Sequence, residues 1–342
     1  MEKSLIEFRK SYKDGLLSLL WRQWSAIGVP GYCGEEDNSV VDPEALLIFT
    51  CSIARSDPRL FDEVLDWLGT NGELINVQRL RMILTREDFS GKRVLAAMAE
   101  TIGRGYRARK WKGLFGPDGA VNKPEPLFYS PDNMPLEHFG NADKVFLRYG
   151  LSRGKIKSRG TAAPPQYLKN ALTLRLRALF GVTVRPEILA YLLTHDSAHP
   201  SIIAKEAYFS QKAVQDAMVE MSKSGVIPVR TAGREKRYRL DKNSWASLLK
   251  AEPDALKWSC RPPLFSALER VWLKLNSTEF KRLDALMISS ELRALMTELR
   301  PKFEQAGLGA LISDDKACKR ERYTPIFISD IEKVLKKAAG AF

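Results

Sequence analysis

Histidine and cysteine, the side chains most often found at metal and nucleophilic sites, are scarce: the 342 residues include three histidines and four cysteines. The cysteines lie far apart and form no Cys-x-x-Cys pair: they are Cys33, Cys51, Cys260 and Cys318. This spacing predicts neither a zinc site nor a disulfide framework, and we expect free thiols in a reducing cytoplasm. His195 and His199 flank Asp196, which we interpret as a polar loop with helix caps rather than a metal or acid–base site.

Long apolar runs are also missing, and none reaches the roughly 20 residues that a membrane span needs. The N-terminal segment MEKSLIEFRK lacks the apolar core of a secretory signal, so we expect a cytoplasmic protein without a membrane partner. The glycine-rich phosphate loop and the GxSxG and HExxH motifs are absent. The carboxylate pairs Glu35-Glu36 and Asp314-Asp315 fall in loop-like stretches. We therefore predict no enzyme, no cofactor and no metal.

The net charge of +13 is concentrated in the middle of the chain. Residues 1–143 carry 18 basic and 21 acidic side chains, and residues 251–342 carry 16 and 13, so these flanks cancel. Residues 144–250 carry 20 basic and 7 acidic side chains, and their first part, 144–186, has ten Lys or Arg and no Asp or Glu. Such a block attracts a polyanion, most often nucleic acid. A solvated basic surface without a ligand is the alternative.

The first 113 residues predict an α-helical domain. Apolar residues at helical spacing mark a helix over 4–24, and Asp42-Pro43 and Asp57-Pro58 are helix-start signals, with Asp as N-cap and Pro in the first turn. Further helices are expected over 75–84 and 90–102. The basic, aromatic stretch 103–113 fits a DNA contact and a solvated helix end equally well. Prolines over 114–135 and a Gly-, Ser- and Lys/Arg-rich stretch over 150–166 predict a basic linker region over 114–165.

Residues 166–250 contain the pattern on which the functional prediction depends. The first predicted helix, over 167–180, has one buried face formed by Leu168, Leu172, Leu176 and Leu179. Pro186 opens a second helix that runs to about His195. Ser201 is the expected N-cap of a short helix, and Tyr208-Phe209 is expected to form a tight turn after it.

A third helix and a β-hairpin follow that turn. Ser210 is the expected N-cap of a helix to about Lys223, which Gly225 terminates. Its predicted buried stripe, at i, i+3, i+4 and i+7, consists of Val214, Ala217, Met218 and Met221. Strands are expected over 226–230 and 237–240, with a polar loop over 231–236 between them.

This order of elements resembles the winged helix-turn-helix domain of bacterial transcriptional regulators of the MarR and ArsR type. The matching strings are IIAKEAYFSQKAVQDAMVEMSKSGVI and GREKRYRL, within residues 186–240. The resemblance implies that the third helix enters the major groove of double-stranded DNA and that the hairpin touches the backbone or the minor groove.

The predicted DNA-binding residues lie at the start of the third helix and on the hairpin: Ser210, Gln211, Lys212, Gln215, Arg230, Arg234, Lys236, Arg237 and Arg239. Gln211 and Gln215 can pair with adenine, and Lys212 can reach guanine or phosphate. Ser210 and the free N–H groups of the helix start can hold a phosphate. Asp216 fits this surface poorly, and we expect it to face solvent or to accept from cytosine.

Two other functions stay open at this point. Winged helices also serve as protein–protein interaction or scaffold modules that do not touch DNA, although the recognition faces of those are typically neutral or acidic. A nucleic-acid-processing enzyme is the third possibility, but no catalytic residues are recognisable for it. The main hypothesis is a sequence-specific DNA-binding protein that regulates transcription.

The C-terminal residues 251–342 are expected to be helical and to form either part of a core or a homodimer contact. One helix carries Leu264, Leu268, Val271, Trp272 and Leu275, and a second carries Leu283, Leu286, Met287, Leu292, Leu295 and Met296. Ser329 is the expected N-cap of a terminal helix through Leu335. The prediction as a whole is a mainly α protein with a helical domain at 1–113, a linker region at 114–165, a winged helix at 166–250 and a helical region at 251–342.

Overall fold

A computed structural model describes residues 4–31, 38–103, 108–116, 123–130, 134–138, 140–166, 168–232, 235–250, 256–314 and 323–340. These residues form fifteen α-helices and two small two-stranded sheets, which confirms the mainly α prediction. None of the helices so described is both long and apolar enough to cross a membrane.

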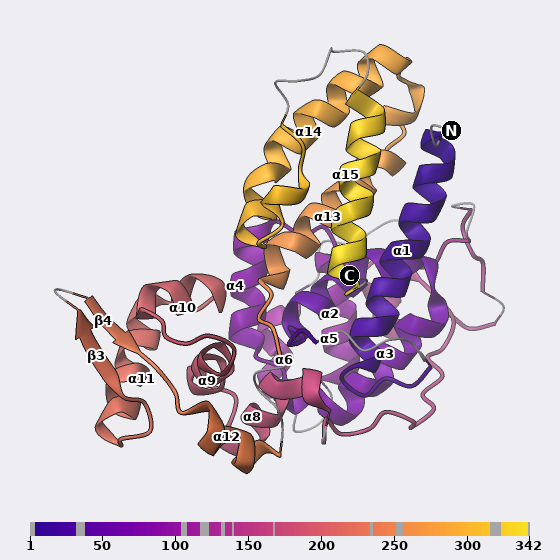
Figure 1. The fold of residues 1–342 in the computed structure, drawn as a ribbon. Helices are drawn as coiled ribbons and strands as arrows, with labels where there is room; N and C mark the ends of the chain where they lie inside the picture. Colours follow the sequence, from indigo (N-terminus) through magenta and orange to yellow (C-terminus); the bar gives the residue numbers. More distant parts are fainter. Residues whose placement is uncertain are drawn as a thin grey trace.

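The larger part of the molecule, which we call the helical body, combines helices from both ends of the chain (Figure 1). From the N-terminal part it takes α1 (Leu5–Ser25), α2 (Pro43–Ile53), α3 (Pro58–Asn71), α4 (Val77–Glu87), α5 (Lys92–Ile102), α6 (Ala108–Trp111) and α7 (Lys144–Arg148). From the C-terminal part it takes α13 (Arg261–Asn276), α14 (Ala285–Gln305) and α15 (Tyr323–Ala338). Short 3-10 turns connect several of these, at Ala54–Ser56, Gly72–Leu74, Lys112–Leu114, Phe280–Arg282 and Gly309–Leu311.

Local capping explains why the N-terminal helices begin where they do. The side chains of Asp42 and Asp57 accept hydrogen bonds from the backbone N–H groups of Ala45 and Leu60, at 3.0 Å each. Each aspartate precedes a proline in the first turn, which fixes φ at a helical value without removing a needed donor. Both predicted helix starts are therefore confirmed.

The C-terminal helices bury their apolar faces against the N-terminal ones. The rings of Phe49 on α2 and Phe265 on α13 stack with their centroids 4.7 Å apart. The Tyr12 hydroxyl of α1 donates to the backbone carbonyl of Leu268 at 3.0 Å. Residues separated by more than 200 positions in the sequence thus share one core.

One expectation for the C-terminal region is wrong: Ser329 lies in the middle of α15, which begins at Tyr323, so it caps no helix start. Leu286 and Met287 lie on a helix as predicted, in the first turn of α14, and are 55% and 54% exposed, ahead of the buried stripe that begins at Ser289.

The described part of 114–165 lies against the helical body. Strands β1 (Glu125–Pro126) and β2 (Leu151–Ser152) pair in parallel, and the guanidinium of Arg153 follows β2 into the interior. It lies 5.2 to 5.7 Å from three phenylalanine rings and donates to Asp62 at 2.6 Å. This buried arginine fixes a proline- and glycine-rich segment to α3.

The second part of the molecule has a hydrophobic core of its own (Figure 1). We call it the α8–α12 unit, and it contains α8 (Leu172–Phe180), α9 (Val184–Thr194), α10 (Pro200–Glu206), α11 (Gln211–Lys223), β3 (Val229–Ala232), β4 (Glu235–Tyr238) and α12 (Lys242–Leu249). The 3-10 turn Lys169–Ala171 leads into it. In Figure 1 the β3–β4 hairpin lies on the side of the molecule away from α1 and α3.

Several predicted boundaries in this unit need correction. Helix α9 begins at Val184, two residues before Pro186, with Thr183 as its N-cap. Helix α10 is capped by the His199 ring and not by Ser201, whose backbone N–H instead donates to that ring at 3.2 Å. The hairpin strands pair over 229–232 and 235–238, so the turn is shorter than predicted.

The unit meets the helical body at a buried cluster of charged side chains. Arg177 of α8 pairs with Glu44 of α2 at 2.6 Å and with Glu187 of α9 at 2.7 Å. Arg79 of α4 pairs with the same Glu44 at 2.6 Å and with Asp42 at 2.5 Å. Because the five side chains come from four segments and are almost fully buried, they fix the orientation of the unit on the body.

Candidate nucleic-acid interface

The turn between α10 and α11 is held by a buried tyrosine. Tyr208 adopts a left-handed backbone conformation, with φ of 58°, and its hydroxyl donates to the Glu87 carboxylate of α4. Ser210 then caps α11 as predicted, accepting from the backbone N–H of Ala213 at 3.2 Å. The turn therefore fixes where α11 begins relative to the helical body.

Helix α11 has one buried and one exposed face. The predicted buried stripe of Val214, Ala217, Met218 and Met221 is confirmed. Gln211, Lys212 and Asp216 are exposed at the start of the helix, and Gln215 is half-buried. The first two turns thus present one exposed amide, one half-buried amide, an ammonium group and a carboxylate.

The hairpin carries its cations on both faces. Arg230 and Arg237 are directly opposite each other in the antiparallel register, as are Thr231 and Lys236. Because side chains alternate along a strand, Arg230 and Arg237 share one face, whereas Lys236 lies on the other face with buried Tyr238. Arg239 follows β4 and is exposed. The predicted site residue Arg234 lies outside the described residues.

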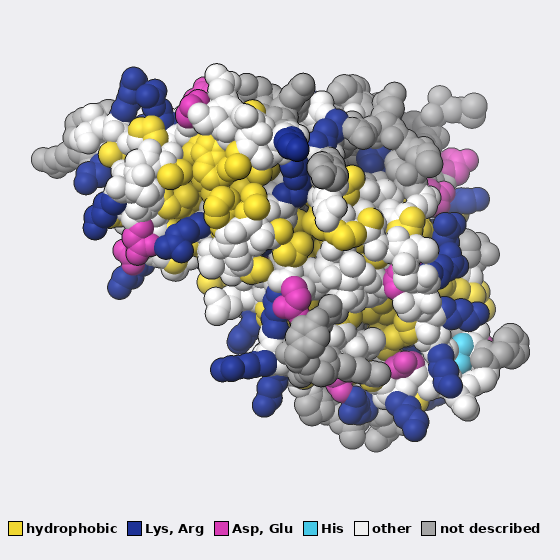
Figure 2. Space-filling model, turned by 90° about the horizontal axis from the view of Figure 1, so that it is seen from below, with side chains coloured by type: hydrophobic (Ala, Val, Ile, Leu, Met, Phe, Trp, Pro, Cys, Tyr) yellow, Lys and Arg dark blue, Asp and Glu magenta, His cyan; other side chains and the backbone are white. Residues whose placement is uncertain are grey.

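Two arginines opposite each other on a hairpin repel, which costs stability unless an anion lies between or beside them. Among the described residues, no carboxylate forms a salt bridge with Lys212, Arg230, Lys236, Arg237 or Arg239. Two carboxylates, Asp216 and Glu235, are also exposed on these elements. The hairpin and the start of α11 therefore form a surface on which five cations outnumber two carboxylates. Figure 2 shows Lys and Arg side chains around the edge of this part of the molecule.

A backbone contact that the sequence did not reveal supports the hairpin. Ala198, in the connection between α9 and α10, pairs with Tyr238 of β4 through two hydrogen bonds of 2.9 Å. Ala198 thus pairs with the hairpin as a third strand would, although it belongs to the helical part of the unit. A single residue in extended conformation has no periodicity, so no sequence pattern marks it.

Much of the basic block at 144–186 is neutralised by acidic side chains. Within the part of the chain that the structure describes, five of its ten cations form ion pairs: Arg148 with Glu100, Arg153 with Asp62, Arg159 with Glu63, Arg177 with Glu44 and Glu187, and Arg185 with Glu220. Four of these partners belong to the helical body. These cations stabilise the fold through their ion pairs. The cations of α11 and the hairpin therefore indicate a polyanionic ligand more strongly than the block at 144–186 does.

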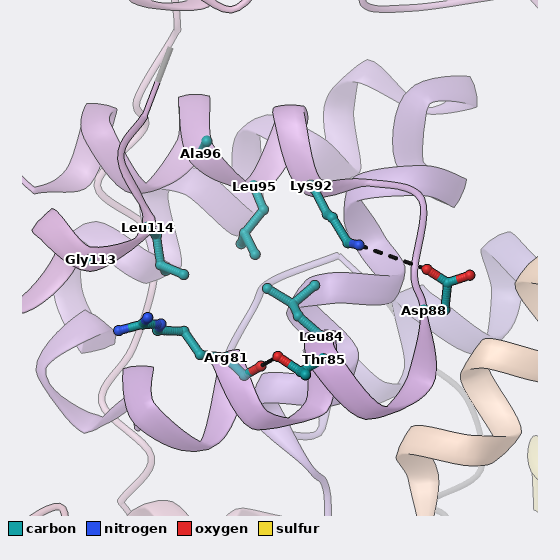
Figure 3. Close-up of a pocket in the computed structure, with 9 residues that line it drawn as sticks. All are labelled: Arg81, Leu84, Thr85, Asp88, Lys92, Leu95, Ala96, Gly113 and Leu114. Atoms are coloured by element: carbon teal, nitrogen blue, oxygen red, sulfur yellow. Dashed lines mark hydrogen bonds and ion pairs between the residues drawn. The ribbon is translucent and has the colours of Figure 1, made fainter. Parts of the chain in front are cut away.

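A concavity lies on the helical body between α4 and α5, away from the hairpin (Figure 3). It has a volume of about 450 Å³, and Leu84, Leu95 and Leu114 point into it. Lys92 on its rim pairs with Asp88 at 3.7 Å, and Arg81 lies at the opposite end. The Asp88 carboxylate is thus paired, and the Thr85 hydroxyl donates to the backbone carbonyl of Arg81 at 2.9 Å, so both reactive group types of this lining already have partners.

The remaining polar candidates have structural roles. His195 stacks on Tyr191 at 3.9 Å, and its Nδ1 lies 2.9 Å from the Tyr191 carbonyl. Burial raises the pKa of the Cys260 thiol to about 12, so it is a poor nucleophile at neutral pH. No cluster of His, Cys, Asp and Glu that could hold a metal occurs among the described residues. Cys33 and Cys318 lie outside them.

The chain matches no protein-family model, and no curated protein or solved structure is significantly similar to it.

Proposed function

We propose that this protein binds double-stranded DNA through the α8–α12 unit, used as a winged helix-turn-helix. The observation that carries the proposal is the net positive surface formed by the start of α11 and the β3–β4 hairpin, where Lys212, Arg230, Lys236, Arg237 and Arg239 outnumber Asp216 and Glu235. Helix α11 is the second helix of a helix–turn–helix pair and is followed directly by the hairpin, which is the order that places a recognition helix beside a wing.

In this proposal the first turn of α11 enters the major groove. Gln211 and Gln215 read adenine, and Lys212 reads guanine or holds a phosphate. Arg230, Lys236, Arg237 and Arg239 neutralise phosphates along the adjacent backbone. The most economical biological role is a cytoplasmic transcriptional regulator that occupies a promoter site, acting as a monomer or a homodimer.

A protein–protein interaction module is the second candidate, and one observation favours it. Leu179 and Leu248 of this unit are 59% and 62% exposed, and Figure 2 shows an apolar area over α8 and α12. Such a surface suits a partner protein or a ligand. It lies on α8 and α12, whereas the cations lie on α11 and the hairpin, so both uses are compatible in one chain.

The experiment is a fluorescence-anisotropy titration of labelled random duplex DNA across a salt series. Affinity is expected to fall steeply with salt, because each neutralised phosphate releases counterions. The double variant Lys236→Ala/Arg237→Ala is expected to reduce the slope of log K against log salt by about 2, since about 0.9 is lost for each phosphate contact.

The matched control is Arg282→Ala/Lys336→Ala, which removes one arginine and one lysine exposed on the helical body. Both double variants lower the net charge by the same amount, so an effect of net charge alone would lower the affinity for DNA equally in the two. Equal slopes for the two variants, or weak and salt-insensitive binding of the wild type, would rule out the hairpin as a DNA contact and favour the interaction module.

A further inference from the structure

An apolar cavity of about 520 Å³ lies at the junction between the helical body and the α8–α12 unit. The body contributes Leu74, Pro164 and Pro165, α8 contributes Leu179, and α12 contributes Leu248 and Leu249. Both the volume and the position between two cores are typical of small-molecule sites.

The cavity leaves large apolar side chains in contact with water. Leu179, which the sequence predicts to be buried, is 59% exposed, and Leu248 is 62% exposed. Covering these leucines with an apolar ligand removes their surface from water, at about 25 cal/mol for each Å² buried.

The polar groups around the cavity are cationic or neutral. Arg175 on α8 and Lys250 at the end of α12 line it, together with the amides of Asn71 and Gln166. The Arg175 guanidinium donates to the Leu249 carbonyl, which holds the cation at the cavity wall. None of the described residues that line the cavity is Asp or Glu. The described lining thus holds two cations and no carboxylate, which suits an anionic group beside an apolar chain.

We propose that this cavity binds a small amphipathic monoanion, such as a medium-chain carboxylate. The alkyl chain lies against Leu74, Leu179 and Leu248, and the carboxylate faces Lys250 and Arg175. Charge complementarity distinguishes this ligand from a neutral lipid or alcohol of the same length. The proposal concerns the cavity alone and holds whether or not the hairpin binds DNA.

The test compares decanoate with decanol by isothermal titration calorimetry on the full chain. Decanoate is expected to bind at one saturable site at least tenfold more tightly than decanol, because the carboxylate accepts charge-assisted hydrogen bonds from the cations and the alcohol does not. Lys250→Gln is expected to remove most of that difference while leaving decanol unchanged. Leu179→Glu places a carboxylate at an exposed position beside the ligand and is expected to abolish decanoate binding.

Ala178→Trp fills the cavity, and its matched control is Ala294→Trp at an exposed position of α14. Only the first is expected to abolish binding of both probes, with circular dichroism checking that both variants are folded. Absence of saturable decanoate binding overturns the proposal, as does equal affinity for decanol. Decanoate binding that survives both Ala178→Trp and Leu179→Glu places the ligand elsewhere and also overturns it. A further outcome that overturns the proposal is a wild-type dimer, measured by light scattering, that Leu179→Glu converts to a monomer. The leucines would then be covered by a second copy of the chain.

Discussion

At the scale of single residues, the side chains with the largest energetic consequences are the buried charges between the two cores. Burial raises the pKa of Glu187, and this effect outweighs the opposing influence of Arg177 and Arg79. A carboxyl whose pKa is higher in the folded state binds more protons there than in the unfolded chain. Its contribution to the free energy of unfolding therefore falls as pH rises above the ordinary value of 4.5.

Replacing Arg177 by Met should lower the free energy of unfolding by about 3–5 kcal/mol near neutral pH, because it leaves Glu187 buried without its ion-pair partner and leaves Glu44 paired with Arg79 alone. The pKa of Glu187 then rises further, so the deficit should be larger at pH 8 than at pH 5. Urea denaturation at both pH values measures this.

The control is Arg185→Met, which breaks the exposed pair with Glu220 and should cost less than about 1 kcal/mol at either pH. If the two variants lose the same free energy at both pH values, the buried cluster does not join the two cores as described.

At the scale of elements, α11 illustrates where sequence patterns succeed. Its cap, its length and its buried stripe all follow from local rules that act within one helix, and each is confirmed. The strands of the hairpin begin and end at other residues than predicted, because Tyr238 pairs with both Val229 and Ala198. These pairings join different segments of the chain, so they do not follow from a pattern within one strand. Likewise, Leu179 continues the period of a buried face, but it lies at the end of α8, where none of the elements that the structure describes covers it.

The proposed recognition role of α11 makes a prediction at this scale. The double variant Lys212→Ala/Gln215→Ala should weaken binding to a selected tight site by about 2–5 kcal/mol, while weakening binding to random duplex much less. Competition anisotropy with the selected site and random DNA measures both. The matched control is Lys223→Ala/Ser222→Ala at the far end of the same helix. A ratio of specific to non-specific affinity that stays at the wild-type value would exclude base reading by this helix.

At the scale of the whole molecule, the two ends of the chain complete one core. Removal of residues 261–342 uncovers Phe49 and the face of α1 around Tyr12, so the remaining chain should lose its cooperative urea transition. Near-UV circular dichroism and urea denaturation report this loss. Co-expression of the missing segment should restore the transition, because the contacts are non-covalent. A truncated chain that unfolds cooperatively on its own would show instead that 251–342 is a separate domain.

The sequence by itself determined the mainly α class, the starts of the capped helices and the buried stripe of α11, because these depend on residues a few positions apart. It also located the cations that the proposed DNA surface uses. Only the tertiary structure decided which cations are available: Arg153 and Arg177 are buried against carboxylates of distant segments, whereas those of the hairpin are not. The shared core of the two chain ends and the apolar cavity at the junction were likewise invisible in the sequence, because each is formed by elements that no local pattern connects.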